Sequence, residues 1–276
     1  MDKMDYCASL RNIEGALESS PNVKFVKGDI QSMDLLTFVL SAEKAFTMNN
    51  TYGTHVYGET SLGKDEGLQE HSMLDPTNPY SAAKAGAEMM CKAYQTSYKL
   101  PVIITRGNNV YGPHQFPEKM IPKFVIRASR GADLPIHGDG EAVRSYLFVE
   151  DVARAFDAVL HKGVTGEVYN IGTDKERTVL EVAHDIAKAF NLSSSKVVHV
   201  KDRAFNDRRY YIGSDKLGAL GWKETTSWEE GLKRTIDWYL NTSCEEYWQG
   251  DLEAALRPHP LLVGTSLTGD PSKLVM

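Results

Sequence analysis

The chain has 276 residues, of which 42% are hydrophobic and 25% are charged, and its formal net charge is -6. This composition is typical of a globular protein with one large or two small domains, and the acidic balance argues against a general nucleic-acid binder. Three widely spaced cysteines, Cys7, Cys91 and Cys244, form neither a disulfide framework nor a metal-binding pattern. Because no signal-peptide pattern and no run of ~20 apolar residues is present, we expect a cytoplasmic protein that does not bind membranes.

Strands and helices alternate along the chain. The apolar patterns predict strands at 23–27, 101–105, 145–149 and 167–171. They predict helices at 35–46, 80–98, 118–130 and 150–161, and two further helices open at the capping boxes 178–181 and 227–230. In helix 80–98 the apolar residues form one stripe, namely Ala83, Ala87, Met90, Cys91 and Tyr94. The alternation predicts an α/β fold with a parallel sheet.

Tyr80 and Lys84 are the first candidate catalytic residues. They stand four positions apart in a predicted helix, so their side chains share one face. A neighbouring ammonium favours the phenolate form of a tyrosine, whose ordinary pKa is about 10. Such a pair can take a proton from a sugar hydroxyl while a nicotinamide accepts a hydride. The spacing alone also fits an ordinary helix surface.

Two further groups have side chains suited to a polar, anionic ligand. Asn109 lies in a Gly/Asn loop that follows a predicted strand, where α/β sheets bind ligands, although a plain turn fits equally well. Four arginines have guanidinium groups that suit phosphate oxygens: Arg144, Arg203, Arg208 and Arg209. For any single arginine, a solvated salt bridge is the simpler interpretation.

Asp2 and Asp29 each stand where a strand can end. An acidic residue in that place can bind an adenosine ribose when a glycine fingerprint precedes it. No G-x-G-x-x-G precedes Asp2 in this sequence, so an ordinary exposed aspartate is the simpler interpretation from the residues alone.

Several segments together resemble the nucleoside-diphosphate-glucose 4,6-dehydratases of the extended short-chain dehydrogenase/reductase superfamily. The resemblance rests on the segments 2–7, 27–30, 50–54, 76–80, 107–124, 135–140, 144–151, 169–172 and 202–210, and covers most of the chain to about residue 260. The sequences of these segments are most similar to the dehydratase domain of plant-type UDP-rhamnose synthases. The resemblance implies a Rossmann-like domain over 1–112, a mainly substrate-binding domain over 113–262, and a tail over 263–276.

The resemblance also implies a role for individual residues. Those expected at NAD are Asp2, Lys3, Asp29, Ile30, Asn49, Tyr80 and Lys84. Those expected at UDP-glucose or dTDP-glucose are Asn109, Lys119, Pro135, His137, Arg144, Asn170, Asp202, Arg203 and Asn206. No metal is implied. Tyr80 would deprotonate the C4 hydroxyl while NAD accepts the C4 hydride; water then leaves across C5 and C6, and the hydride returns to C6.

Three parts of the family pattern have no counterpart in this sequence. They are the first strand with its glycine-rich loop, a strand and loop expected between 43 and 46, and the helix and strand ending in Thr-Asp-Glu. At the third gap, Thr54-His55-Val56-Tyr57-Gly58-Glu59 joins the flanking motifs directly. Because the missing acids perform the elimination and the missing strands are central, we expect a weak or inactive dehydratase with reduced stability.

Two other functions remain open. One is a related epimerase or decarboxylase acting on a nucleotide sugar. The other is a non-catalytic form that binds a sugar nucleotide or a full-length partner. The resemblance implies a homodimer formed through two long helices, but one of them has no counterpart here, so assembly is left open.

Overall fold

The computed structural model describes residues 2–29, 31–32, 34–35, 54–59, 63, 66–202, 208–248 and 250–257. Four predicted site residues, Ile30, Asn49, Arg203 and Asn206, lie outside the described residues. So do most of the predicted helix 35–46 and the tail. None of the described helices is both long enough and apolar enough to cross a membrane.

The described strands pair mainly in parallel, which confirms the α/β prediction. β1 (Ile104–Gly107) pairs with β5 (Val168–Ile171), and β3 (Leu134–His137) pairs with β7 (Val197–Val200). β4 (Val143–Phe148) pairs in parallel with β2 (Asn109–Tyr111) and β8 (Arg209–Tyr210), and antiparallel with β6 (Glu176–Thr178). Within the described residues the strands form three small sheets rather than one continuous sheet.

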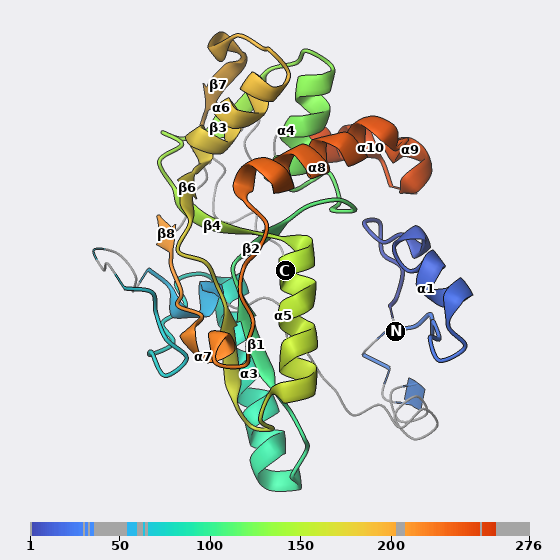
Figure 1. Cartoon of the computed structure of the whole chain (residues 1–276), viewed down its shortest axis with the longest axis vertical. Helices are drawn as coiled ribbons and strands as arrows, with labels where there is room; N and C mark the ends of the chain where they lie inside the picture. The colour runs from blue at the N-terminus through green and yellow to red at the C-terminus, as the bar shows by residue number, and fades with distance from the viewer. Residues whose placement is uncertain are drawn as a thin grey trace, which may run out of the picture.

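In the part of the chain that the structure describes, five helices of ten or more residues cover these strands (Figure 1). They are α3 (Pro79–Tyr98), α4 (Met120–Ser129), α5 (Val149–Lys162), α6 (Val179–Ala189) and α8 (Trp228–Asn241). The shorter helices are α1 (Glu14–Ser19), α7 (Asp215–Gly218), α9 (Cys244–Tyr247), α10 (Leu252–Leu256) and the 3-10 turns η1 (Leu10–Asn12), η2 (Thr54–Tyr57) and η3 (Ser194–Lys196). The predicted capping box at α6 forms both of its hydrogen bonds, between Thr178 and Glu181.

Two main groups of buried side chains hold the elements together. The larger one lies between α4, α6 and α8 and includes Phe124, Ile186 and Leu232. The other lies under α5 and includes Leu147 and Ala155. Figure 1 shows the corresponding division, with α4, α6 and α8 at one end of the molecule and α3 and α5 at the other.

The N-terminal segment lies beside α9 and α10 (Figure 1). The Ser9 hydroxyl donates a hydrogen bond to the Tyr247 carbonyl at 2.7 Å, and the Tyr247 hydroxyl donates to Asn12 at 2.8 Å. The sequence placed this segment in a Rossmann-like domain over 1–112. Through Tyr6 it also contacts Glu118, so the segment borders the loop that precedes α4.

The structure differs from two expectations about elements. The predicted strand 23–27 is reduced to one parallel bridge between Asp2 and Lys27. Among the described residues, no strand pairs with it over a greater length. In α3 the predicted stripe is largely exposed, with Met90 58% and Tyr94 49% exposed, while Ala85 and Glu88 are buried. The helix turns this other face inward because Glu88 is paired with a buried arginine of β1.

Candidate functional site

The first turn of α3 brings Tyr80 and Lys84 together. Asn78 caps the helix by accepting a hydrogen bond from the Ser81 amide at 2.9 Å, and Pro79 occupies the first turn, where its missing N–H costs nothing. The Lys84 ammonium lies 5.6 Å from the centroid of the Tyr80 ring. Tyr80 is 51% exposed, so its ring is accessible to a ligand.

A buried ion pair fixes α3 against β1. Arg106 donates to the two carboxylate oxygens of Glu88 at 2.9 and 2.5 Å, and each side chain is 2% exposed. Burial opposes the charged carboxylate, but the hydrogen bonds from Arg106 and Lys92 outweigh it, so the pKa of Glu88 lies below its ordinary value. Glu88 stands one helical turn beyond Lys84. The Glu88–Arg106 ion pair therefore fixes the position of the helix segment that carries Tyr80 and Lys84 relative to β1.

Asn170 belongs to the same buried hydrogen-bond network. Its carboxamide accepts a hydrogen bond from the Tyr57 hydroxyl at 2.9 Å and donates one to the Leu68 carbonyl at 3.0 Å. Arg106 also donates to the Tyr57 hydroxyl. Asn170, which the sequence predicted at the nucleotide, is completely buried and lines neither of the two cavities described below. Both of its polar groups are committed to holding β5 against the segment after η2.

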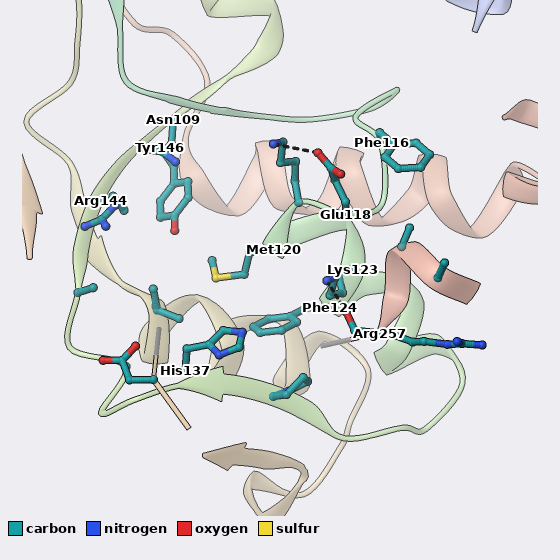
Figure 2. A pocket seen from close by; sticks show the side chains of 18 of the residues that line it. Asn109, Phe116, Glu118, Met120, Lys123, Phe124, His137, Arg144, Tyr146 and Arg257 are labelled. Atoms are coloured by element: carbon teal, nitrogen blue, oxygen red, sulfur yellow. Dashed lines mark hydrogen bonds and ion pairs between the residues drawn. The ribbon is translucent and has the colours of Figure 1, made fainter. Parts of the chain in front are cut away.

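A cavity with a volume of about 840 Å³ lies between β2, β4, the loop 113–119, α4 and α10, and we name it the nucleotide cavity after the ligand proposed for it below. Figure 2 shows Asn109, Arg144 and Tyr146 on one side, with Lys123, Phe124 and Arg257 on another. Six of the predicted substrate residues are gathered around it: Asn109, Lys119, Pro135, His137, Arg144 and Asp202. These residues lie far apart in the sequence, and the structure brings them to one place.

The charges of the nucleotide cavity are mixed, with a cationic excess. Arg144 stacks on the Tyr210 ring, with 4.6 Å between the guanidinium carbon and the ring centroid. Lys119 pairs with Glu118 at 3.1 Å, and Arg208 pairs with Asp139 at 3.2 Å. Outside the cavity, Arg209 forms a two-bond ion pair with Glu176 at 2.7 and 2.5 Å, so for this arginine the salt-bridge interpretation is correct.

Several cavity residues were missed by sequence reasoning. They are Tyr6, Phe116, Glu118, Lys123, Phe124, Tyr146, Asp251 and Arg257. Lys123 carried a detectable signal, because it follows Lys119 by one helical turn and shares its face. The residues of α10 carried none, since nothing in a short C-terminal helix indicates which surface it covers.

A second, smaller cavity of about 430 Å³ lies in the N-terminal segment, and we call it the N-terminal cavity. Met4, Leu10 and Phe25 supply apolar walls, and Gly250 closes it from the C-terminal half. None of the predicted cofactor residues that the structure describes lines it. Three lie near residues that do: Asp2 in the bridge to Lys27, Lys3 paired with Asp5 at 3.1 Å, and Asp29 two positions after Lys27. Tyr80 and Lys84 line neither cavity.

Comparison with known proteins gives one family. The family model described as GDP-mannose 4,6 dehydratase matches residues 35–235. A trifunctional enzyme of Arabidopsis thaliana, named as a UDP-glucose 4,6-dehydratase, 3,5-epimerase and reductase, is 51% identical over 307 positions, covering 95% of this chain and 45% of its own length. Human dTDP-D-glucose 4,6-dehydratase is 37% identical, covering 95% of this chain and 86% of its own length. The chain thus spans less than half of the Arabidopsis relative.

Solved structures agree with this result. The crystal structure of dTDP-glucose 4,6-dehydratase from Bacillus anthracis in complex with NAD has a TM-score of 0.82 and 36% identity, covering 90% of this chain and 88% of that one. The matched fold, the family model and the sequence identities lead to one conclusion. The chain matches the GDP-mannose 4,6 dehydratase family model and belongs with the nucleoside-diphosphate-glucose 4,6-dehydratases of the short-chain dehydrogenase/reductase superfamily.

Proposed function

We propose that this chain binds UDP-glucose or dTDP-glucose and acts on it as an NAD-dependent 4,6-dehydratase, a hydro-lyase of deoxysugar biosynthesis. The observation that supports this most directly is the nucleotide cavity. Its aromatic and apolar walls, among them Phe124 and Tyr146, suit a base and a sugar ring. Arg144 and Lys119 suit the two phosphates.

The residues beside the N-terminal cavity fit the adenosine half of NAD. Its apolar walls at Met4, Leu10 and Phe25 suit a flat adenine ring. Asp2 and Asp29 provide carboxylates of the kind that accept hydrogen bonds from ribose hydroxyls. NAD, when bound, supplies a hydride acceptor for C4 and returns the hydride to C6.

Tyr80 and Lys84 would handle the proton of the first step. The Tyr80 phenolic oxygen accepts the proton of the C4 hydroxyl, and the Lys84 ammonium stabilises the phenolate by its charge. The later loss of water needs an acid and a base at C6 and C5. The Thr-Asp-Glu motif that supplies them in the family has no counterpart here, so we propose that elimination is slow.

A second candidate is binding of the sugar nucleotide without turnover. It is favoured by the fact that Tyr80 and Lys84 line neither cavity. In this case the nucleotide cavity is functional and the catalytic pair is not.

Incubation with UDP-glucose or dTDP-glucose in the presence of NAD separates the two candidates. A 4-keto-6-deoxy product, detected by its absorbance in alkali, is expected to form slowly with wild type, and Tyr80→Phe is expected to lower the rate at least 100-fold, as for loss of a general base. Equal rates for the two proteins would refute the assigned role of Tyr80. Binding of UDP with no product from wild type would establish the second candidate.

A further inference from the structure

Tyr6 is shared by the two cavities. Tyr6 lines the nucleotide cavity together with Phe116 and Glu118, and it also lines the N-terminal cavity together with Met4 and Phe25. Among the described residues it is the one common to both linings. A ligand in either cavity therefore lies next to the same residue.

Tyr6 also contacts the loop that forms one wall of the nucleotide cavity. Its hydroxyl donates a hydrogen bond to Glu118 at 2.8 Å, and its ring meets the Phe116 ring edge-on, with centroids 5.5 Å apart. Glu118 in turn pairs with Lys119 at 3.1 Å, one of the cations expected at the phosphates. The hydrogen bond to Glu118 raises the pKa of Tyr6 to about 12, so the phenol remains a donor at neutral pH.

The backbone around Tyr6 is held close to the C-terminal half. A Cβ added to Gly250 would lie 2.7 Å from the Tyr6 carbonyl oxygen, so the two segments touch and only a glycine fits. Gly250 lines the N-terminal cavity, and the next residue, Asp251, lines the nucleotide cavity. Consecutive residues of this segment thus line the two cavities. The Tyr6 side chain itself is 57% exposed, so it keeps freedom that a ligand can remove.

We propose that Tyr6 couples the two cavities, so that NAD in the N-terminal cavity strengthens the binding of a nucleoside diphosphate in the nucleotide cavity. The inference rests on the proposed function, because it takes NAD and UDP as the two ligands. A ligand that orders Tyr6 also orders Phe116 and Glu118, and the second ligand then meets a wall that is already fixed. The coupling is reciprocal, since each ligand must change the affinity of the other by the same factor.

Calorimetric titration tests the coupling without requiring turnover. UDP is titrated into wild-type protein with and without saturating NAD, and NAD is titrated with and without saturating UDP. We expect each ligand to lower the Kd of the other by the same factor, about two- to tenfold, which corresponds to one net hydrogen bond. Tyr6→Phe keeps the ring and removes the donor, so the factor is expected to fall to about one while both ligands still bind.

Tyr98→Phe is the matched control. Tyr98 is a 75% exposed tyrosine of α3 that lines neither cavity, so its variant is expected to keep the wild-type factor. An unchanged factor in Tyr6→Phe, a factor of one in wild type, or loss of the factor in Tyr98→Phe would each overturn the inference. If NAD or UDP titrated alone shows no binding, the proposed function fails and the coupling with it. If both bind without coupling, only the inference fails.

Discussion

At the scale of single residues, the buried pair of Glu88 and Arg106 has the largest structural consequence. Glu88→Gln would leave a buried guanidinium without its countercharge, which costs about 3–5 kcal/mol of unfolding free energy. Lys92 also pairs with Glu88, at 2.6 Å, but it is 45% exposed, so Lys92→Met is expected to cost less than about 1 kcal/mol. Urea unfolding of both variants measures the difference, and equal losses would contradict a dominant role for the buried pair.

A double variant separates charge from packing. Replacing both partners with apolar residues, Glu88→Leu with Arg106→Met, removes the uncompensated charge, so the double variant is expected to be more stable than Glu88→Gln alone. The same urea titration detects this. A double variant less stable than Glu88→Gln would mean that the hydrogen bonds from Arg106 to the Tyr57 hydroxyl and the Glu70 carbonyl matter more than the charge pair.

These residues show what sequence reasoning reaches at this scale. The contact of Tyr80 with Lys84 follows from helical spacing and was predictable. The pairing of Glu88 with Arg106 joins different elements, and no spacing rule predicts it. The burial of Asn170 has the same origin, because its partners, Tyr57 and Leu68, are about 100 residues away in the sequence.

At the scale of elements, α3 shows which face of a helix is buried. Ala85 is 3% exposed and Ala87 is exposed, although the two lie in the same helix. Ala85→Val adds volume against η2 and is expected to cost about 1–3 kcal/mol by overpacking. Ala87→Val changes only helix propensity and is expected to cost less than about 0.7 kcal/mol. Thermal or urea unfolding compares the two variants. A larger loss of unfolding free energy for Ala87→Val would mean that the face predicted from the sequence is the buried one.

The elements that the sequence located best are those with local signals. The predicted capping boxes at Thr178 and Ser227 mark the starts of α6 and α8. The predicted strand 23–27 lacks such a signal, because a strand becomes regular only when a neighbour pairs with it. The prediction that the apolar stripe of α3 is buried was wrong for a related reason. Helical periodicity gives a face, and only tertiary contacts decide whether that face is covered.

At the scale of the whole molecule, the relatives contain residues that this chain lacks. The matches to plant and human relatives run over 306 or 307 positions, more than the 276 residues of the chain. This agrees with the prediction of missing internal segments. Buried polar groups of Ser81 and Asn108 have no hydrogen-bond partner among the residues that the structure describes, and such a group costs about 1–3 kcal/mol. The missing segments and the buried polar groups without partners are both expected to lower the free energy of unfolding.

Two buried carboxylates link elements across the molecule and make its stability depend on pH. Asp151, in the first turn of α5, accepts hydrogen bonds from the Thr225 and Thr226 amides at 2.9 and 3.1 Å, just before α8. Burial opposes its charge, but these hydrogen bonds outweigh it, so the pKa of Asp151 lies below its ordinary value, as does that of Glu88.

The direction of the pH effect follows from these lowered pKa values. The stability that Asp151 and Glu88 contribute is present above their unfolded-state pKa values of about 4, and it is lost as pH falls through the lower folded-state values. Urea unfolding between pH 7 and pH 3 is expected to show a loss that begins near pH 5. Asp151→Asn is expected to be less stable at pH 7 by about 1–3 kcal/mol and to lose less on acidification. Asp157→Asn, at an exposed position of the same helix, is expected to keep the wild-type slope. Equal slopes for Asp151→Asn and wild type would show that acid acts elsewhere in the molecule.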